Sequence, residues 1–190
     1  MPRRPSYWRD TIKKQTGQLA FGGGIAALSL VILLLSAIIP TAEIALPAIA
    51  GFALLPVVVE LGKKAALTVY GAVSLLALVL VASWEPKLLY IAFFGYYPIL
   101  KATLESRLPR WAEWLCKLAV FNVAAVAVYW VLLRFLGLPA DSFTLDGMDL
   151  RWAFLLMGNI VFLLFDVGLT QSVGAYMRRW SPLFRKTFRF

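Results

Sequence analysis

Long apolar runs constrain this chain more than any other feature of its sequence. A helix of roughly 20 apolar residues spans the hydrocarbon core of a bilayer, and the sequence divides into six runs of about that length. The six predicted helices cover residues 19–39, 44–61, 65–83, 88–103, 112–136 and 150–176. We therefore predict an all-α, polytopic membrane protein in which residues 19–176 form a six-helix transmembrane bundle.

The composition favours a bilayer over water as the solvent of this fold. Hydrophobic residues make up 61% of the chain and charged residues 15%, and the mean hydropathy is +0.78. Soluble domains are close to half apolar and a quarter charged. Prolines interrupt the second and fourth runs at Pro47, Pro56 and Pro98. Proline kinks a helix, so a re-entrant path for either run stays open beside a full crossing.

The basic residues predict how the bundle is oriented. All but three of the 19 Lys and Arg fall in the tails 1–18 and 177–190 and in two short connections. The connections hold Lys63, Lys64, Lys101, Arg107, Arg110 and Lys117. Because Lys and Arg concentrate in short cytoplasmic loops, we expect both termini in the cytoplasm. The net charge of +9 is then explained by topology, and nucleic acid is not an expected partner.

Several kinds of chemistry are excluded by residue type. The chain has one cysteine, Cys116, and no histidine. An intramolecular disulfide, a Cys/His zinc cluster and a Ser-His-Asp triad therefore cannot form. The Gly22–Gly24 run lacks the lysine of a phosphate-binding loop. We predict neither an enzyme nor a bound cofactor or metal.

Asp166 is the clearest polar residue within an apolar run. It lies near the middle of the sixth predicted helix, where an ionised carboxylate costs about 2.5–3.5 kcal/mol on insertion scales. Other polar side chains predicted at the same depth are Ser29, Ser74, Tyr96, Tyr97 and Asn122. We expect the Asp166 carboxylate to face the bundle interior and to form a hydrogen bond with Tyr96, Tyr97 or Asn122.

Two further residues extend this polar layer toward the outside. Asn159 precedes Asp166 by two helical turns on the same face, and Glu43 lies between Pro40 and Pro47 at the predicted outer mouth. The predicted ligand-binding residues are Glu43, Tyr96, Tyr97, Asn122, Asn159 and Asp166. Interhelical hydrogen bonding explains the same residues as a purely structural layer, and both readings stay open.

Small residues are dense in the first predicted helix. Ala20, Gly22, Gly23, Gly24, Ala26 and Ala27 form three overlapping small-xxx-small pairs. Such pairs let a second helix approach closely. They predict a docking face for a partner subunit, although packing inside the bundle would use the same residues.

Together, six helices in a short chain, cytoplasmic termini, a small-residue surface on the first helix and a proline-bounded first outer loop resemble the substrate-binding S component of energy-coupling factor (ECF) transporters. The resemblance implies a vitamin-like substrate bound near the outside and docking through the first helix on a membrane coupling subunit with ATPases. It also implies a multi-pass protein of the bacterial cytoplasmic membrane.

Two other functions remain compatible with the sequence. One is a non-transporting envelope scaffold similar to rod-shape-determining membrane proteins, in which the polar layer is structural. The other is a small gradient-driven transporter that uses Asp166 as a proton or cation site. The substrate cannot be read from the sequence in any of these cases.

Overall fold

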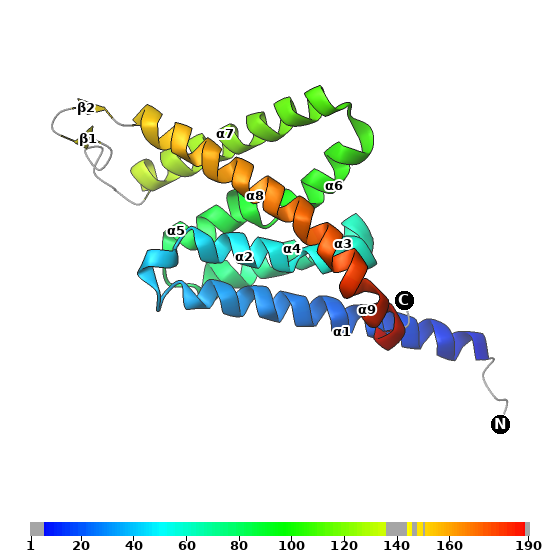
Figure 1. Cartoon of the computed structure of the whole chain (residues 1–190). Coiled ribbons are helices and arrows are strands. Elements are labelled where there is room, and N and C mark those ends of the chain that lie inside the picture. Colours follow the sequence, from blue (N-terminus) through cyan, green and yellow to red (C-terminus); the bar gives the residue numbers. More distant parts are fainter. Residues whose placement is uncertain (1–5, 136–143, 146–147, 150, 189–190) are drawn as a thin grey trace.

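The computed structural model describes the backbone of residues 6–135, 144–145, 148–149 and 151–188, and side chains at 15–39, 41–135 and 152–184. The all-helical class is confirmed, since the described part departs from it only in the two-residue antiparallel pair β1 (Thr144–Leu145) and β2 (Met148–Asp149). The helices are α1 (Ser6–Leu35), η1 (Pro40–Ala42), α2 (Ala45–Ala53), α3 (Leu55–Glu60), α4 (Gly62–Leu80), α5 (Trp84–Leu89), the π-helix η2 (Tyr90–Phe94), α6 (Tyr97–Arg107), α7 (Arg110–Phe135), α8 (Arg151–Arg179) and α9 (Ser181–Phe188) (Figure 1).

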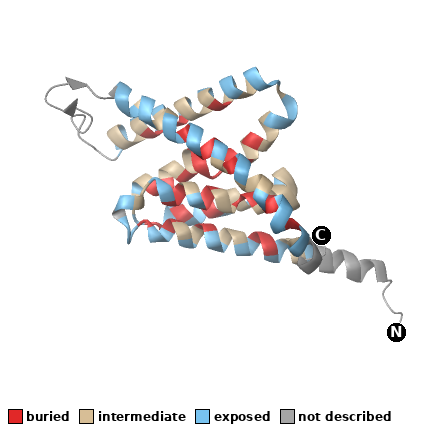
Figure 2. Cartoon of the chain, in the orientation of Figure 1, coloured by how far each residue is buried: buried red, intermediate tan, exposed pale blue. Residues whose placement is uncertain are grey.

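Four of the described helices are long and apolar enough to cross a membrane. These are Gln15–Leu35, Gly62–Leu80, Arg110–Phe135 and Trp152–Arg179. At most 22% of the residues in each apolar stretch are buried, and large side chains such as Leu75, Val123 and Leu164 are about two-thirds exposed (Figure 2). Such extensive apolar exposure marks a surface that is covered by something other than water, as expected of a membrane protein.

The second predicted helix is broken in two. Leu54 separates α2 from α3, and its N–H bonds back to the Gly51 carbonyl at 3.1 Å. Pro56, in the first turn of α3, has no N–H to donate. The next break follows at Gly62, whose φ of +84° lies in the left-handed region that glycine adopts readily. The proline and glycine of this segment therefore set its ends.

The fourth predicted helix is longer than expected and consists of α5, η2 and α6. The Gly95 N–H reaches the Tyr90 carbonyl at 2.8 Å, which is the i→i+5 bond of a π turn. Pro98 lies in the first turn of α6, where its missing donor costs nothing. A side chain on Gly95 would collide with the Tyr70 ring, about 2.7 Å from the Cβ position. Close packing on α4 therefore requires glycine here.

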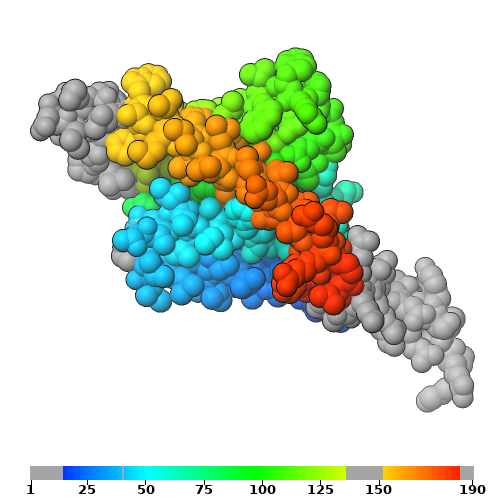
Figure 3. All heavy atoms as spheres, in the orientation of Figure 1, coloured from blue at the N-terminus to red at the C-terminus, as the bar shows by residue number. Residues whose placement is uncertain are grey.

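The bundle has two distinct ends (Figure 1). We call the end that holds η1 and the starts of α5 and α8 the β end, and the opposite end the α9 end. Three buried clusters connect the helices: one joins α3, η2, α6, α7 and α8, one joins α1, α2, α4 and η2, and one lies near the α9 end. α8 crosses the face of the molecule from the β end to α9 (Figure 3).

Both predicted basic tails contain helix. α1 begins at Ser6, within the predicted tail 1–18, although side chains 1–14 lie outside the described residues. The tail 177–190 includes α9, which packs against the bundle. The Phe184 ring lies 5.3 Å from the Phe21 ring of α1 and 6.1 Å from the Tyr176 ring of α8.

Candidate functional site

Asp166 lies in the middle of α8 with only 4% of its side chain exposed. The Tyr97 hydroxyl donates a hydrogen bond of 2.6 Å to its Oδ1, and the Lys101 ammonium lies 2.6 Å from the same oxygen. The predicted hydrogen bond between Asp166 and a tyrosine of the fourth predicted helix is thus confirmed. The lysine beside it was not predicted.

The prediction that Lys101 and Lys117 lie in a cytoplasmic connection is wrong. They lie within α6 and α7, and their side chains are 5% and 1% exposed. Lys117 reaches Glu113 at 2.5 Å, Glu105 at 2.9 Å and Asp166 at 3.3 Å, and Lys101 reaches Glu105 at 2.6 Å. A helical turn separates each lysine from an acid on its own helix, so the pairs form locally.

We call Asp166, Lys101, Lys117, Glu105 and Glu113 the charge cluster. It contains three carboxylates and two ammonium groups from α6, α7 and α8. The three N–H donors of Lys117 meet three carboxylates, which matches the donor capacity of an ammonium group. The cluster therefore links three helices through satisfied ion pairs.

Asn122 and Asn159 pair with each other rather than with Asp166. Each side-chain amide donates to the other's carbonyl oxygen at 3.0 Å. The second hydrogen of each NH₂ group bonds to a backbone carbonyl one turn earlier at 2.8 Å. Because an amide carries both a donor and an acceptor, two facing asparagines satisfy one another, and this pair joins α7 to α8 nearer the β end.

An aromatic layer packs around these polar groups. The Phe93 ring lies 4.7 Å from Tyr97, 5.2 Å from Phe121 and 5.7 Å from Phe162. Phe121 and Phe162 stack at 4.9 Å. Tyr96, next to Tyr97, lies 6.4 Å from the Phe93 ring and 6.0 Å from the Tyr70 ring of α4. The two predicted tyrosines therefore serve different helix contacts.

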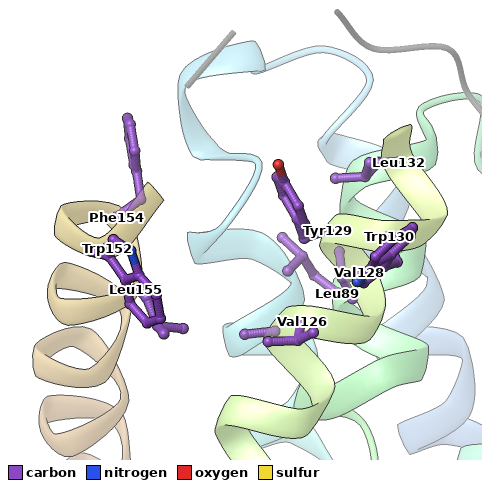
Figure 4. Close-up of a pocket in the computed structure, with 10 residues that line it drawn as sticks. Leu89, Val126, Val128, Tyr129, Trp130, Leu132, Trp152, Phe154 and Leu155 are labelled. Atoms are coloured by element: carbon purple, nitrogen blue, oxygen red, sulfur yellow. The ribbon is translucent and has the colours of Figure 1, made fainter. Parts of the chain in front are cut away.

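Two apolar cavities lie between α7, α8 and the α5–η2 segment toward the β end. The larger has a volume of about 720 Å³ and the smaller about 290 Å³. Both are lined by Leu89, Ala125, Val128 and Phe154. In the larger cavity, Trp152 and Leu155 of α8 face Val126 and Tyr129 of α7 (Figure 4).

None of the six predicted ligand residues lines either of these two cavities. Three of them adjoin lining residues in the sequence: Glu43 precedes Ile44, Asn122 follows Phe121, and Asn159 follows Gly158. Phe93, Phe121 and Phe162 line the smaller cavity and also belong to the aromatic layer. The sequence signal for these cavities was the group of small residues on the facing helices α7 and α8, namely Ala124, Ala125 and Gly158. A prediction based on polar residues does not include them.

The small residues of α1 divide between two faces. Gly22 is buried, and a Cβ there would lie 3.4 Å from Val69 of α4, while Ala26 packs on a core cluster. The residues Ala20, Gly23, Gly24 and Ala27 are exposed. Nothing lies within 4 Å of a Cβ built on Gly23 or Gly24. Four of the six predicted docking residues thus form an open face.

Comparisons of the chain with protein-family models, with curated proteins and with solved structures gave no match. The cavities, the charge cluster and the open face of α1 are therefore the features from which a function can be inferred.

Proposed function

We propose that this chain is a six-crossing membrane subunit that binds a small molecule for uptake, similar to the S components of ECF transporters. The observation that carries the proposal is the pair of apolar cavities, which adjoin one another at the β end and end at the aromatic layer. Beyond that layer lies the charge cluster. A binding site with a packed floor suits a subunit that captures a ligand and depends on a partner for its release.

Six crossings follow if the two proline-broken segments also span. α2 and α3 together form an apolar stretch over Ala45–Glu60 that is shorter than the four long helices, and α5, η2 and α6 extend from Trp84 to Arg107. At about 1.5 Å per residue their lengths are roughly 24 and 36 Å. Both run between the β end and the α9 end (Figure 1). Lys63, Lys64, Arg107 and Arg110 then lie on the side of the basic tails, which makes the α9 end cytoplasmic.

The open face of α1 is the proposed docking surface for a coupling subunit. Ala20 and Gly24 are one small-xxx-small pair on it, and Gly23 and Ala27 are the other. Because lipid is as apolar as leucine, close backbone approach and van der Waals contact are what associate helices in a bilayer. A face of small exposed residues supplies that approach.

The docking part of this proposal is tested by affinity purification of the tagged chain from native membranes in mild detergent. We expect a membrane subunit and ATPases to co-purify with the wild type and to be lost in the variant Gly23→Leu/Ala27→Leu. The matched control is Ala119→Leu/Ala127→Leu, two exposed alanines on α7, which should retain the partners. A wild type that brings down no ATPase, or equal loss in the control, would contradict the proposal.

The topology is tested separately with reporters fused to successive connections. Fusions after Lys64 and after Arg107 should report cytoplasmic positions, and a fusion after Trp84 should report an external one. An external result after Lys64 would show that the α2–α3 segment does not cross.

A non-transporting scaffold is the second proposal, and the completeness of the charge cluster favours it. Asp166 has a tyrosine and two lysines as partners, as expected of a polar layer that holds helices together. A scaffold needs no ligand, so a bound small molecule recovered from the purified protein by mass spectrometry would separate it from the first proposal.

A further inference from the structure

The chemistry of the two cavities limits what they can hold. Among the described residues that line them, none is an aspartate, glutamate, lysine or arginine. Side-chain polarity comes from the Tyr129 hydroxyl and from the indole nitrogens of Trp130 and Trp152 in the larger cavity. The smaller cavity has only apolar and aromatic side chains and one glycine.

We infer that the ligand of these cavities is an uncharged, predominantly apolar small molecule with a ring system; this inference rests on the proposed binding function. A charged group moved from water into such surroundings loses its hydration without gaining a counter-ion, which is strongly unfavourable. Flat aromatic walls from Phe121, Phe154 and Phe162 favour stacked or edge-on contact with rings. The larger cavity, at about 720 Å³, is within the size range of small-molecule sites.

The opening of the larger cavity is suited to a ligand that enters from the membrane. Lining residues of this cavity on α7 and α8 are also exposed on the surface: Trp130 is 55% exposed and Trp152 is 77% exposed. The space between the two helices is visible in Figure 4. Tryptophan is enriched at membrane interfaces. The opening of the larger cavity therefore lies where an apolar molecule dissolved in the bilayer can reach it.

The charges of α7 and α8 behind the aromatic layer are already paired. Asp166 and Lys117 lie behind the aromatic layer and bind each other and their neighbours. The Asn122–Asn159 pair uses its own amide groups. No described group in these two sets is left to accompany a charged ligand. Toward the β end, the Arg134 guanidinium of α7 lies over the Trp130 ring, 5.8 Å from its centroid, and lines neither cavity. Recognition therefore depends on the shape of the cavities and on their apolar walls.

The test uses two fluorescent probes of the same shape that differ in one charged group: N-phenyl-1-naphthylamine is neutral, and 8-anilinonaphthalene-1-sulfonate is its anionic counterpart. Each is titrated into nanodiscs that contain the purified protein, with the signal of empty nanodiscs subtracted. We expect saturable binding of the neutral probe and binding at least tenfold weaker for the anion.

Variants locate the binding. Ala125 lines both cavities, so Ala125→Trp should abolish the saturable signal of the neutral probe. Ala127→Trp, on the exposed face of the same helix, is the matched control and should leave binding unchanged. If Ala125→Trp does not fold, Val126→Trp tests the larger cavity alone, because Val126 lines it and is already 46% exposed.

Three outcomes would overturn the inference. Equal binding of both probes, removed by Ala125→Trp, would show a site that accepts charge. A neutral-probe signal that survives both filling variants would place binding elsewhere. A phospholipid that native mass spectrometry finds on the wild type, and that the neutral probe cannot displace, would identify an acyl chain as the occupant. None of these decides whether ATPases co-purify, so the proposed function stands or fails on its own experiment.

Discussion

α7 and α8 meet in two different ways along their length. Toward the α9 end, Lys117 of α7 and Asp166 of α8 lie 3.3 Å apart, and Phe121 stacks on Phe162. Toward the β end, the same helices diverge around cavities of about 720 and 290 Å³. The half of this helix pair toward the α9 end is joined by ion pairs and aromatic rings, and the half toward the β end is open and apolar.

This contrast indicates how a pair of helices can keep an opening between them in a bilayer. Apolar side chains gain little by leaving lipid for one another, so helix association depends on packing and on polar contacts. The ion pairs and the Asn122–Asn159 pair supply those contacts at one half. The other half can then stay apart without separating the helices. We expect mutations in the polar half to change stability most and mutations in the open half to change ligand binding most.

The largest effect is expected from Lys117→Met. Methionine fills a similar volume but leaves Asp166 and Glu105 with Lys101 alone, and it removes the ammonium group that Glu113 contacts. Removing one member of a buried ion pair typically costs about 3–5 kcal/mol. Equilibrium unfolding in mixed micelles should show a loss of this order. Adding Asp166→Asn should cost less than the sum of the single changes, because the two groups interact directly; additive losses would contradict the contact.

A smaller effect is expected from breaking the amide pair. Asn159→Ala leaves the Asn122 amide without its partner across the helix interface. Interhelical hydrogen bonds in membrane proteins contribute about 0.6 kcal/mol on average and up to about 1.7 kcal/mol, so the free energy of unfolding should fall within this range. The double variant Asn122→Ala/Asn159→Ala should be no less stable than the single one. A loss above that of Lys117→Met would reverse the proposed order.

A third prediction compares a partly exposed carboxylate of the charge cluster with a more buried one. Glu105 is 40% exposed, whereas Glu113 is 14% exposed. Ion pairs open to solvent contribute about 0–1 kcal/mol and are screened by salt. Glu105→Gln should therefore lower the free energy of unfolding by less than about 1 kcal/mol, and the loss should shrink in high salt. Glu113→Gln should cost more and respond less to salt; the opposite order would show that burial does not govern the cluster.

The smallest change in stability is expected in the open half. Ala125→Leu adds side-chain atoms to a wall that both cavities share. Because lipid already provides an apolar surrounding, the gain is limited to dispersion contacts, and unfolding should shift by less than about 1 kcal/mol. Overpacking of a filled core typically costs about 1–3 kcal/mol. A loss of that size would mean that the helices do not leave this space free.

Asp166 shows what the sequence could reveal about the candidate site. A carboxylate in the middle of an apolar run is costly enough to require a partner, and Tyr97 proved to be one. Lys101 and Lys117 were assigned to a connection because each is close to the α6–α7 turn in sequence. Their role depends on Asp166 of α8, which is 49 residues from Lys117. A spacing rule within one helix carries no information about such a partner.

The all-helical class and the apolar lengths that suit a bilayer follow from the sequence alone. A helix satisfies its backbone hydrogen bonds within one segment, and its apolar length is a local property. Pro56 and Pro98 likewise indicated where helices break. Three features could be seen only in the folded molecule: which small residues of α1 are exposed, which lysines contact Asp166, and where α7 and α8 diverge to leave cavities. Those features depend on the angles at which distant helices cross, and these angles arise from the packing of side chains that no single segment contains.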